Sequence, residues 1–168
     1  SILGNSGITE SLLSCDLTDP NARNVKDGNS TVLMYTIHYG HKEIVDLLLD
    51  HPKIDLSVIN TGGRTALSVA CNVGHLPIVN ALISKVKFEK EHITRALIES
   101  SGTGNIDLVQ MLLKKFGTEI SGAVNSPNGA MNALWAAAAY NHENVVRTLL
   151  DAGGPNQDVN LAGTSGYT

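Results

Sequence analysis

Cysteine and aromatic residues are scarce in this chain of 168 residues, which has two cysteines and an aromatic share of 4%. Two cysteines provide neither a disulfide framework nor a cysteine-ligated zinc site. So few aromatic rings form no base-stacking platform, and a net charge of -4 leaves no basic excess to attract phosphates. We therefore expect no nucleic-acid partner.

Long apolar runs are also missing. The longest extends from Ala133 to Tyr140, whereas a membrane-spanning helix needs about 20 residues. No charged-then-apolar signal segment opens the sequence. We therefore expect no membrane span and a cytoplasmic protein, with a nuclear location as the alternative. The apolar share of 42% is nevertheless that of a folded chain and argues against disorder.

Catalytic and metal-binding motifs are absent as well. The sequence has no phosphate-binding P-loop, no G-x-G-x-x-G, no G-x-S-x-G and no H-E-x-x-H. His38 and His41 are three residues apart, but Gly40 breaks the helix between them. Cys15 and Cys71 are expected to be buried, inert thiols, since a catalytic thiol would need a positioned base. We predict no catalytic residues, no cofactor and no metal site, and hence no enzyme.

The sequence contains a repeated phrase instead. Residues 44–49, Ile-Val-Asp-Leu-Leu-Leu, return in altered form at 78–83, 108–113 and 145–150, with a fainter copy at 8–13. Each copy has apolar residues at positions i, i+1, i+4 and i+5. This pattern is typical of a helix that buries one side.

A second short apolar segment precedes each strong copy and ends at Gly40, Gly74, Gly104 or Asn141. Gly adopts the left-handed backbone conformation freely and Asn is the next best choice, so these residues are suited to end a helix. They follow one another at intervals of 34, 30 and 37 residues. The pattern predicts two helices and a tight turn in each repeat, with a connecting loop of variable length.

This helix–turn–helix unit of about 33 residues resembles the repeat of the ankyrin repeat family. The family pattern is D-x-x-G-x-T-P-L-H-x-A followed by G-H. Residues 60–70 read Asn-Thr-Gly-Gly-Arg-Thr-Ala-Leu-Ser-Val-Ala and continue to Gly74 and His75. The resemblance covers nearly the whole chain. It implies an all-α ankyrin-repeat solenoid of stacked helix–turn–helix units with finger loops.

The chain departs from the family pattern where the first helix of each repeat begins. The pattern's Pro is replaced by Val32, Ala66, Ala96 and Ala133. Its His is replaced by Met34, Ser68, Ile98 and Trp135. Its Thr is kept in two repeats, as Thr31 and Thr65, and is replaced by Arg95 and Asn132 in the other two. The resemblance implies that the family's Thr–His hydrogen bond is absent, so we expect variable helix starts and lower stability. Trp135 is expected to pack in the core or between repeats, with partner contact as the alternative.

The repeats predict one ankyrin repeat domain over residues 1–168. It consists of a partial repeat 1–25, repeats at about 26–59, 60–89, 90–126 and 127–162, and the start of a further repeat at 163–168. First helices are predicted at 32–39, 66–73, 96–103 and 133–140, second helices at 6–14, 42–50, 76–84, 106–115 and 143–151, and extended fingers at 14–30, 51–64 and 114–131. Neither end resembles the polar capping repeat that such arrays need, so we expect a piece of a longer protein.

The stacking seam is predicted from the same alignment. A repeat of this kind cannot bury its apolar side alone, so its neighbours must cover it. The predicted seam residues are Leu33, Leu67, Leu97 and Leu134 on the first helices, and Ile44, Leu48, Ile78, Leu82, Leu108, Leu112, Val145 and Leu149 on the second helices.

The resemblance implies a module that binds another protein or peptide on the concave face of the array. The alternative is a regulatory or substrate-recruiting segment of a larger enzyme, channel or effector whose catalytic part lies outside this chain. The sequence does not fix the oligomeric state, for which we expect a monomer. The family's contact positions, the finger tips and the two residues before the Gly-His turn, correspond to Ser30, His38, Tyr39, Thr61, Arg64, Asn72, Val73, Glu91, His92, Thr94, Thr103, Asn128, Met131 and Tyr140.

Overall fold

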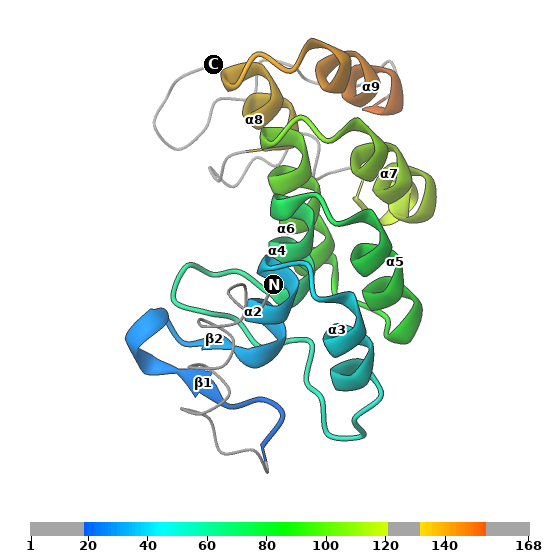
Figure 1. The fold of residues 1–168 in the computed structure, drawn as a ribbon. Coiled ribbons are helices and arrows are strands. Elements are labelled where there is room, and N and C mark those ends of the chain that lie inside the picture. The colour runs from blue at the N-terminus through cyan, green and yellow to red at the C-terminus, as the bar shows by residue number, and fades with distance from the viewer. Residues whose placement is uncertain (1–18, 121–131, 154–168) are drawn as a thin grey trace. The chain divides into compact units, whose positions relative to one another are not determined.

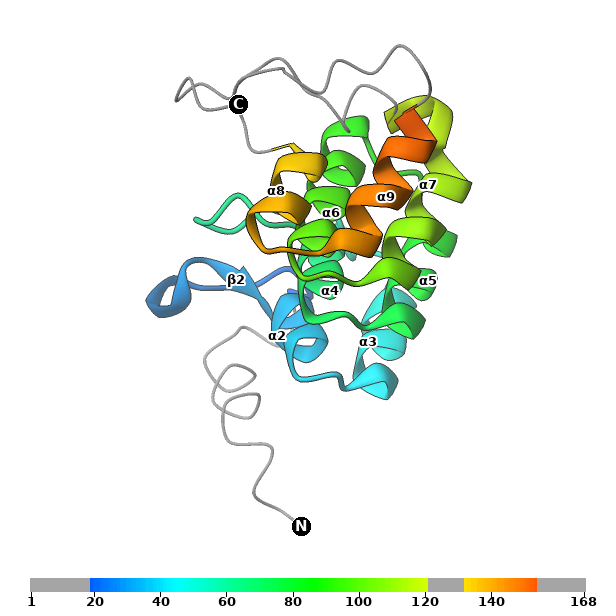
Figure 2. The same ribbon diagram turned by 90° about the horizontal axis from the view of Figure 1, so that it is seen from above.

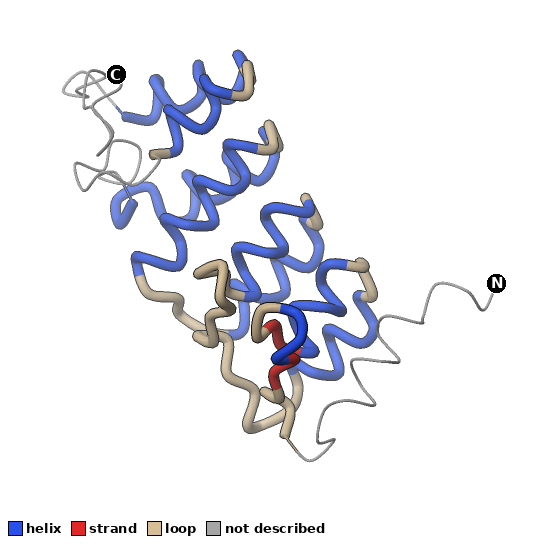
Figure 3. Tube along the Cα trace, turned by 90° about the vertical axis from the view of Figure 1, so that its left-hand side faces the viewer, coloured by secondary structure: helices blue, strands red, loops and turns tan. Residues whose placement is uncertain are grey.

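The computed structural model describes residues 19–120 and 132–153, and almost all of its regular structure is helical (Figure 1). Figure 3 shows helices separated by loops, with a small strand pair near the start of the described chain. The chain divides into two compact units, Ser1–Phe88 and Glu89–Thr168. The all-α expectation is confirmed, whereas the helix predicted at 6–14 lies outside the described residues.

The described part of the first unit opens with a hairpin. Strand β1 (Arg23–Asn24) pairs antiparallel with β2 (Ser30–Thr31), and the short 3-10 helix η2 (Val25–Asp27) lies between them. Gly28 and Asn29, with φ angles of 60° and 57°, turn the chain back. Asn is one of the few residues with a side chain that tolerate this left-handed region. The predicted extended finger is thus a hairpin in its described part.

Two helix pairs follow the hairpin in the first unit. The first pair is α2 (Val32–His38) and α3 (Lys42–Leu49), and the second is α4 (Ala66–Val73) and α5 (Leu76–Lys85). Helix α2 packs against α4, and α3 packs against α5. Figures 1 and 2 both show these helices side by side in two layers. The predicted bounds of all four helices agree within one residue.

The second unit repeats this arrangement. Its pairs are α6 (Lys90–Gly102) with α7 (Ile106–Ile120), and α8 (Ala133–Ala139) with α9 (Glu143–Gly153). Helix α6 packs against α8 and α7 packs against α9. Within each unit, the first helices therefore form one layer and the second helices the other, as expected for stacked helix–turn–helix units.

The α6 and α7 helices are longer than predicted. Helix α6 begins at Lys90 rather than at residue 96, because Arg95 stands where other repeats have a capping Thr or Asn. Arg favours the helix interior, whereas Thr and Asn favour its first, non-helical position. Helix α7 continues to Ile120, so the finger predicted from residue 114 begins as helix. The rest of that predicted finger, residues 121–131, lies outside the described residues.

Helix starts are better defined than the departures from the repeat pattern suggested. The side chain of Thr31 accepts a hydrogen bond from the Met34 backbone N–H at 3.2 Å. Asn132 Oδ1 accepts one from the Trp135 backbone N–H at 2.6 Å. These side chains satisfy N–H groups that the first helical turn leaves unpaired. The expectation of variable helix starts is therefore wrong for α2 and α8.

The start of α4 has a reciprocal cap. The Ser68 backbone N–H donates to Thr65 Oγ1 at 3.3 Å, and the Thr65 backbone N–H donates to Ser68 Oγ at 2.9 Å. This is a capping box in which Ser replaces the usual Glu or Gln. Ser68 occupies the position of the pattern's His, and its hydrogen bonds with Thr65 fix the start of α4 in place of a Thr–His hydrogen bond.

We expect Thr65→Val, which keeps the side-chain shape but removes the hydroxyl, to lower the free energy of unfolding by about 1–2 kcal/mol. The change removes the acceptor for the Ser68 N–H at a site that is 1% exposed. Urea denaturation followed by circular dichroism measures the loss in the free energy of unfolding. The matched control is Thr65→Ser, which keeps the hydroxyl and should be the more stable variant. Equal stability of the two variants would contradict a role for the cap.

The predicted core is mostly confirmed. Leu33, Leu67, Leu97, Ile78, Leu82, Leu108, Leu112, Val145 and Leu149 are buried. Ile44, Leu48 and Leu134 are only half-buried, so the prediction is wrong for these three. Helix α3 buries Val45 and Leu49 instead, because it turns this side of its surface toward its packing neighbours. Trp135 is 43% exposed, which contradicts its expected packing in a core.

Histidine side chains lie against the turns between helices. A Cβ atom added to Gly40 would lie 2.9 Å from His75 Nε2 in the first unit. In the second unit the His142 ring lies so close to Gly104 that an added Cβ could not be accommodated without movement. His142 Nε2 is also 3.0 Å from the Gly102 carbonyl oxygen. Each ring therefore packs against a turn that belongs to the preceding helix pair.

Within residues 19–120 and 132–153, no helix combines the length and the apolar character that crossing a bilayer requires.

Candidate functional site

A pocket of about 310 Å3 opens in the first unit between two loops and two helices. The hairpin contributes Asp27 and Ser30, and the loop before α4 contributes Asn60 and Arg64. The remaining lining residues are Met34, Tyr35, His38 and Tyr39 from α2, and Val69 and Asn72 from α4. The pocket thus lies where neighbouring repeats meet, on the side that carries the fingers.

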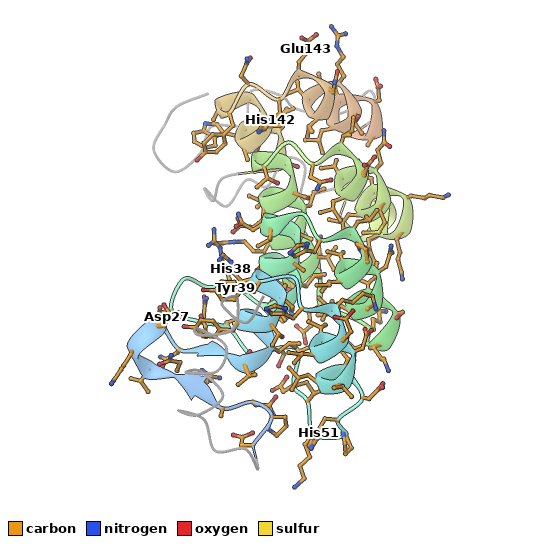
Figure 4. The ribbon with its side chains drawn as sticks, viewed as in Figure 1. Asp27, His38, Tyr39, His51, His142 and Glu143 are labelled. Atoms are coloured by element: carbon orange, nitrogen blue, oxygen red, sulfur yellow. The ribbon has the colours of Figure 1, made fainter. Side chains whose placement is uncertain are left out.

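Helical spacing places the α2 residues together. Tyr35, His38 and Tyr39 stand at positions i, i+3 and i+4, which share one side of a helix. The His38 and Tyr39 rings are 5.1 Å apart and nearly perpendicular, and Tyr39 is 51% exposed. Figure 4 shows both side chains at the end of α2 and Asp27 on the hairpin. This end of α2 presents an exposed aromatic surface beside the pocket.

Hydrogen bonds between the two fingers fix the opposite wall. The backbone N–H and the hydroxyl of Thr61 both donate to the Gly28 carbonyl oxygen, at 2.8 and 3.1 Å. Asn60 Nδ2 donates to Ser30 Oγ at 3.3 Å, and Asn60 Oδ1 accepts from the Arg64 backbone N–H at 3.0 Å. The side chain of Asn60 therefore joins the fingers and holds the backbone of Arg64 in place.

The pocket combines an apolar floor with a polar rim. Met34 is 3% exposed and Val69 is half-buried. One carboxylate, that of Asp27, and one guanidinium, that of Arg64, provide opposite charges among the lining residues. Asp27 is exposed to solvent, whereas Arg64 is half-buried. Such a surface can hold a side chain that has both an apolar stem and a polar end.

A carboxyl with a shifted pKa lies outside the pocket. The pKa of Asp55 is lowered, first because the Ser57 hydroxyl donates to Oδ1 at 2.6 Å and then because the Ser57 backbone N–H donates at 2.8 Å. Both bonds are local to the loop between α3 and α4, and Asp55 is exposed. The shift therefore reflects a loop turn rather than a reactive acid.

The pocket brings together five of the residues predicted to contact a partner: Ser30, His38, Tyr39, Arg64 and Asn72. The other two predicted residues of this unit do not line it. Thr61 is exposed and bonds to the neighbouring finger, and Val73 is 36% exposed at the end of α4.

In the second unit, some of the predicted contact residues lie in other elements than the repeat pattern predicts. Glu91, His92 and Thr94 lie in the first turns of α6 rather than in a finger, because that helix starts early. Thr103 and Tyr140 follow α6 and α8 directly, as predicted for the residues before the turn. Thr103 is exposed and Tyr140 is 62% exposed. The last two predicted residues, Asn128 and Met131, lie outside the described residues.

Sequence reasoning missed five lining residues: Asp27, Met34, Tyr35, Asn60 and Val69. A signal was available for Tyr35, because it precedes His38 and Tyr39 by a helical turn. Asp27 had no such signal, since its position depends on the left-handed residues that shape the hairpin.

In the parts of the chain that the structure covers, no three His, Cys, Asp or Glu side chains are grouped so that they could hold a metal ion. Cys71 is buried and forms no disulfide bond, and Cys15 lies outside the described residues.

Comparisons with known proteins identify the family. A family model described as ankyrin repeats, in three copies, matches residues 1–95 and 87–162. An ankyrin repeat and KH domain-containing protein of Caenorhabditis briggsae is 33% identical over 108 residues, which are 60% of this chain and 4% of that protein. The ankyrin repeat and SAM domain-containing protein 6 of Mus musculus is 32% identical over 101 residues, which are 58% of this chain and 11% of that protein.

A third relative has an enzyme's name. The probable E3 ubiquitin-protein ligase XBOS32 of Oryza sativa subsp. japonica is 39% identical over 56 residues, which are 33% of this chain and 11% of that protein. The match thus spans only a small part of each of these three relatives. The chain belongs to the ankyrin repeat family, whose repeats are in general protein-interaction modules and typically non-catalytic.

Proposed function

We propose that this chain binds a partner protein or peptide on its finger side, by which we mean the fingers together with the layer of first helices in each unit. In the first unit this side comprises the hairpin, the loop before α4, and helices α2 and α4. In the second unit it comprises α6 and α8. Its role is recognition, without catalysis by residues of this chain.

The observation that carries this proposal is the pocket in the first unit. Five residues selected by their repeat positions line one hollow that has an apolar floor and a polar rim. Tyr39 and Arg64 are among them, and Tyr and Arg are over-represented among residues that dominate binding energies. Each combines a large contact area with a hydrogen-bonding end, so a partner gains both packing and orientation.

A second candidate function is the recruitment of a substrate or regulator to a larger enzyme, channel or effector. The relative named as a probable E3 ubiquitin-protein ligase supports this candidate, because a segment of a protein with an enzymatic name is similar to this chain. The binding face would be the same in both cases. Only the molecule that carries the repeats would differ.

We expect the combined change Tyr39→Ala, Arg64→Ala and Tyr140→Ala to weaken partner binding by at least about 30-fold, since even one hot-spot side chain contributes about 2 kcal/mol or more. The three side chains are half-buried or exposed, so the melting temperature should change little. Crosslinking followed by mass spectrometry identifies the partner, and isothermal titration calorimetry measures its affinity.

The matched control carries Asn80→Ala and Gln110→Ala, which remove exposed side chains from α5 and α7 in the layer of second helices. This control should bind as tightly as the unmodified chain. A triple variant that stays folded and keeps full affinity, or a control that loses affinity, would place the binding surface elsewhere and contradict the proposal.

A further inference from the structure

We infer that the pocket in the first unit holds an uncharged aromatic side chain of the partner. This inference rests on the proposed function, because it assumes that a partner binds on the finger side. It adds the chemistry of one contact, in which a ring from the partner covers Met34 and Val69 and packs against Tyr35 and Tyr39.

The first argument is that polar groups of the pocket are already engaged within the structure. The Asn60 side chain donates to Ser30 Oγ and accepts from the backbone N–H groups of Gly62 and Arg64. Arg64 and Asn72 each take part in a further interaction within the structure. We therefore assign the ligand no hydrogen bond with these residues. What the pocket still offers a ligand is mainly carbon and ring surface.

The second argument is the chemistry of that remaining surface. Tyr35 and Tyr39 of α2 line the pocket together with Met34 and Val69. Aromatic rings attract one another in edge-to-face and offset arrangements, beyond the gain from burying apolar area. A thioether sulfur such as that of Met34 also makes favourable contacts with a ring. An aromatic side chain gains from all of these contacts, whereas an aliphatic side chain gains mainly from burial.

The third argument is that neighbouring rings hold Tyr39 in a defined orientation. Its ring centroid lies 5.1 Å from that of His38, at an angle of 87°, and 6.4 Å from that of His41, at an angle of 28°. Tyr39 nevertheless stays 51% exposed. A ring that is already held in place loses little conformational freedom on binding, so more of its contact energy contributes to affinity.

The size and charge of the pocket also suit an uncharged ring. Its volume is about 310 Å3, whereas a dry cavity of roughly 150 Å3 holds a benzene molecule. The pocket thus has room for a ring together with the methylene group that joins it to a backbone. An uncharged occupant also avoids the cost of burying a charge. The Asp27 carboxylate can stay in water, because that residue is exposed.

The test uses the full chain, labelled with carbon-13 in its methionine methyl groups, and four blocked peptides as probes. The peptides are acetyl-Ala-Ala-Phe-Ala-Ala-amide and the same sequence with cyclohexylalanine, Glu or Lys at the centre. Cyclohexylalanine resembles Phe in size and is at least as apolar, but its ring is saturated. We expect the Phe peptide to bind about threefold to tenfold more tightly than the cyclohexylalanine peptide, and the Glu and Lys peptides to bind more weakly than the Phe peptide.

The methyl signal of Met34 reports where the ring binds. Met34 lines the pocket and is 3% exposed, so the ring current of a bound Phe should shift this signal, whereas a saturated ring has no ring current. Met34→Leu identifies the signal by removing it. The Met111 methyl group of α7 is the internal reference, because this residue does not line the pocket, and its signal should stay in place.

Two variants isolate the aromatic contact. Tyr39→Leu keeps an apolar side chain but removes the ring, so it should lower the preference for Phe over cyclohexylalanine at least twofold. Phe116→Leu is the matched control, because it removes a ring from a half-buried residue that does not line the pocket, and it should keep the full preference. The methyl spectra of both variants must show the native fold. The comparison of the peptides on the unmodified chain decides the inference if either variant fails to fold.

Equal or tighter binding of the cyclohexylalanine peptide, tighter binding of the Glu or Lys peptide, or an unchanged Met34 signal would each overturn the inference. These outcomes leave the proposed function standing if the triple variant at Tyr39, Arg64 and Tyr140 still loses the partner. Conversely, selective binding of the Phe peptide by a chain whose triple variant keeps its partner would support the pocket and contradict the proposed binding face.

Discussion

Replacing Gly104 by alanine is expected to lower the free energy of unfolding by about 3 kcal/mol, from a strained backbone and an overpacked contact together. Gly104 has a φ of 72°, a region that residues with a Cβ atom rarely adopt. The new methyl group would also meet the His142 ring and push it from its position near the Gly102 carbonyl oxygen. Urea denaturation followed by circular dichroism measures the loss.

Two further variants separate the strain from the contact. Gly63 has a similar φ of 68°, but an added Cβ there would meet no atom within 4 Å. Gly63→Ala should therefore show the backbone cost alone, about 1–2 kcal/mol. Adding His142→Ala to Gly104→Ala removes the ring that the methyl group would strike, so the two changes should cost less than the sum of their separate effects. If Gly104→Ala and Gly63→Ala lowered the free energy of unfolding equally, the expected clash between the new methyl group and the His142 ring would be refuted.

Truncating Leu82 to alanine should cost about 2–5 kcal/mol, because it removes buried methyl groups and leaves a cavity. Leu82 is 0% exposed in α5, at the fifth position of the repeated apolar phrase. Chemical denaturation of the full chain measures the change.

The control is Leu47→Ala in α3, which makes the same chemical change at a side chain that is 73% exposed. Surface changes of this kind typically stay within about 0.5 kcal/mol. A loss below about 1 kcal/mol for Leu82→Ala would mean that the helix buries a different side and that the alignment of the repeats is wrong.

Most of the fold followed from signals within single repeats. Thr65 at the start of α4 and Gly74 at its end define that helix, and both signals are local to the chain. The prediction failed where a repeat lacks such a signal. Arg95 provides no cap, so nothing in the pattern showed that α6 begins at Lys90.

Burial was harder to predict than helix position. Ile44 and Ile78 are equivalent in the repeat, yet Ile78 is 2% exposed and Ile44 is half-buried. The periodic pattern shows which residues of a helix are apolar, but not which of its sides has a neighbour. Trp135 illustrates the same limit, because its equivalents Met34 and Ser68 are buried and it is not.

The site was predictable only in part for a related reason. His38 and Tyr39 could be selected because they stand immediately before a Gly-His turn. Asp27 could not, since its place in the pocket requires the hairpin turn at Gly28 and Asn29. Side chains on helices follow from the period, whereas those on fingers depend on the backbone angles of their neighbours.

The position of Trp135 has a spectroscopic consequence. It is the only tryptophan in the sequence, and it belongs to the second unit. Indole fluorescence during denaturation therefore reports on the second unit, while circular dichroism averages over the helices of both. Repeat arrays can lose cooperativity between their parts, and coincident transitions by different probes are the usual sign of a single step. Comparing the two optical signals on one sample therefore reveals whether the two units melt as one.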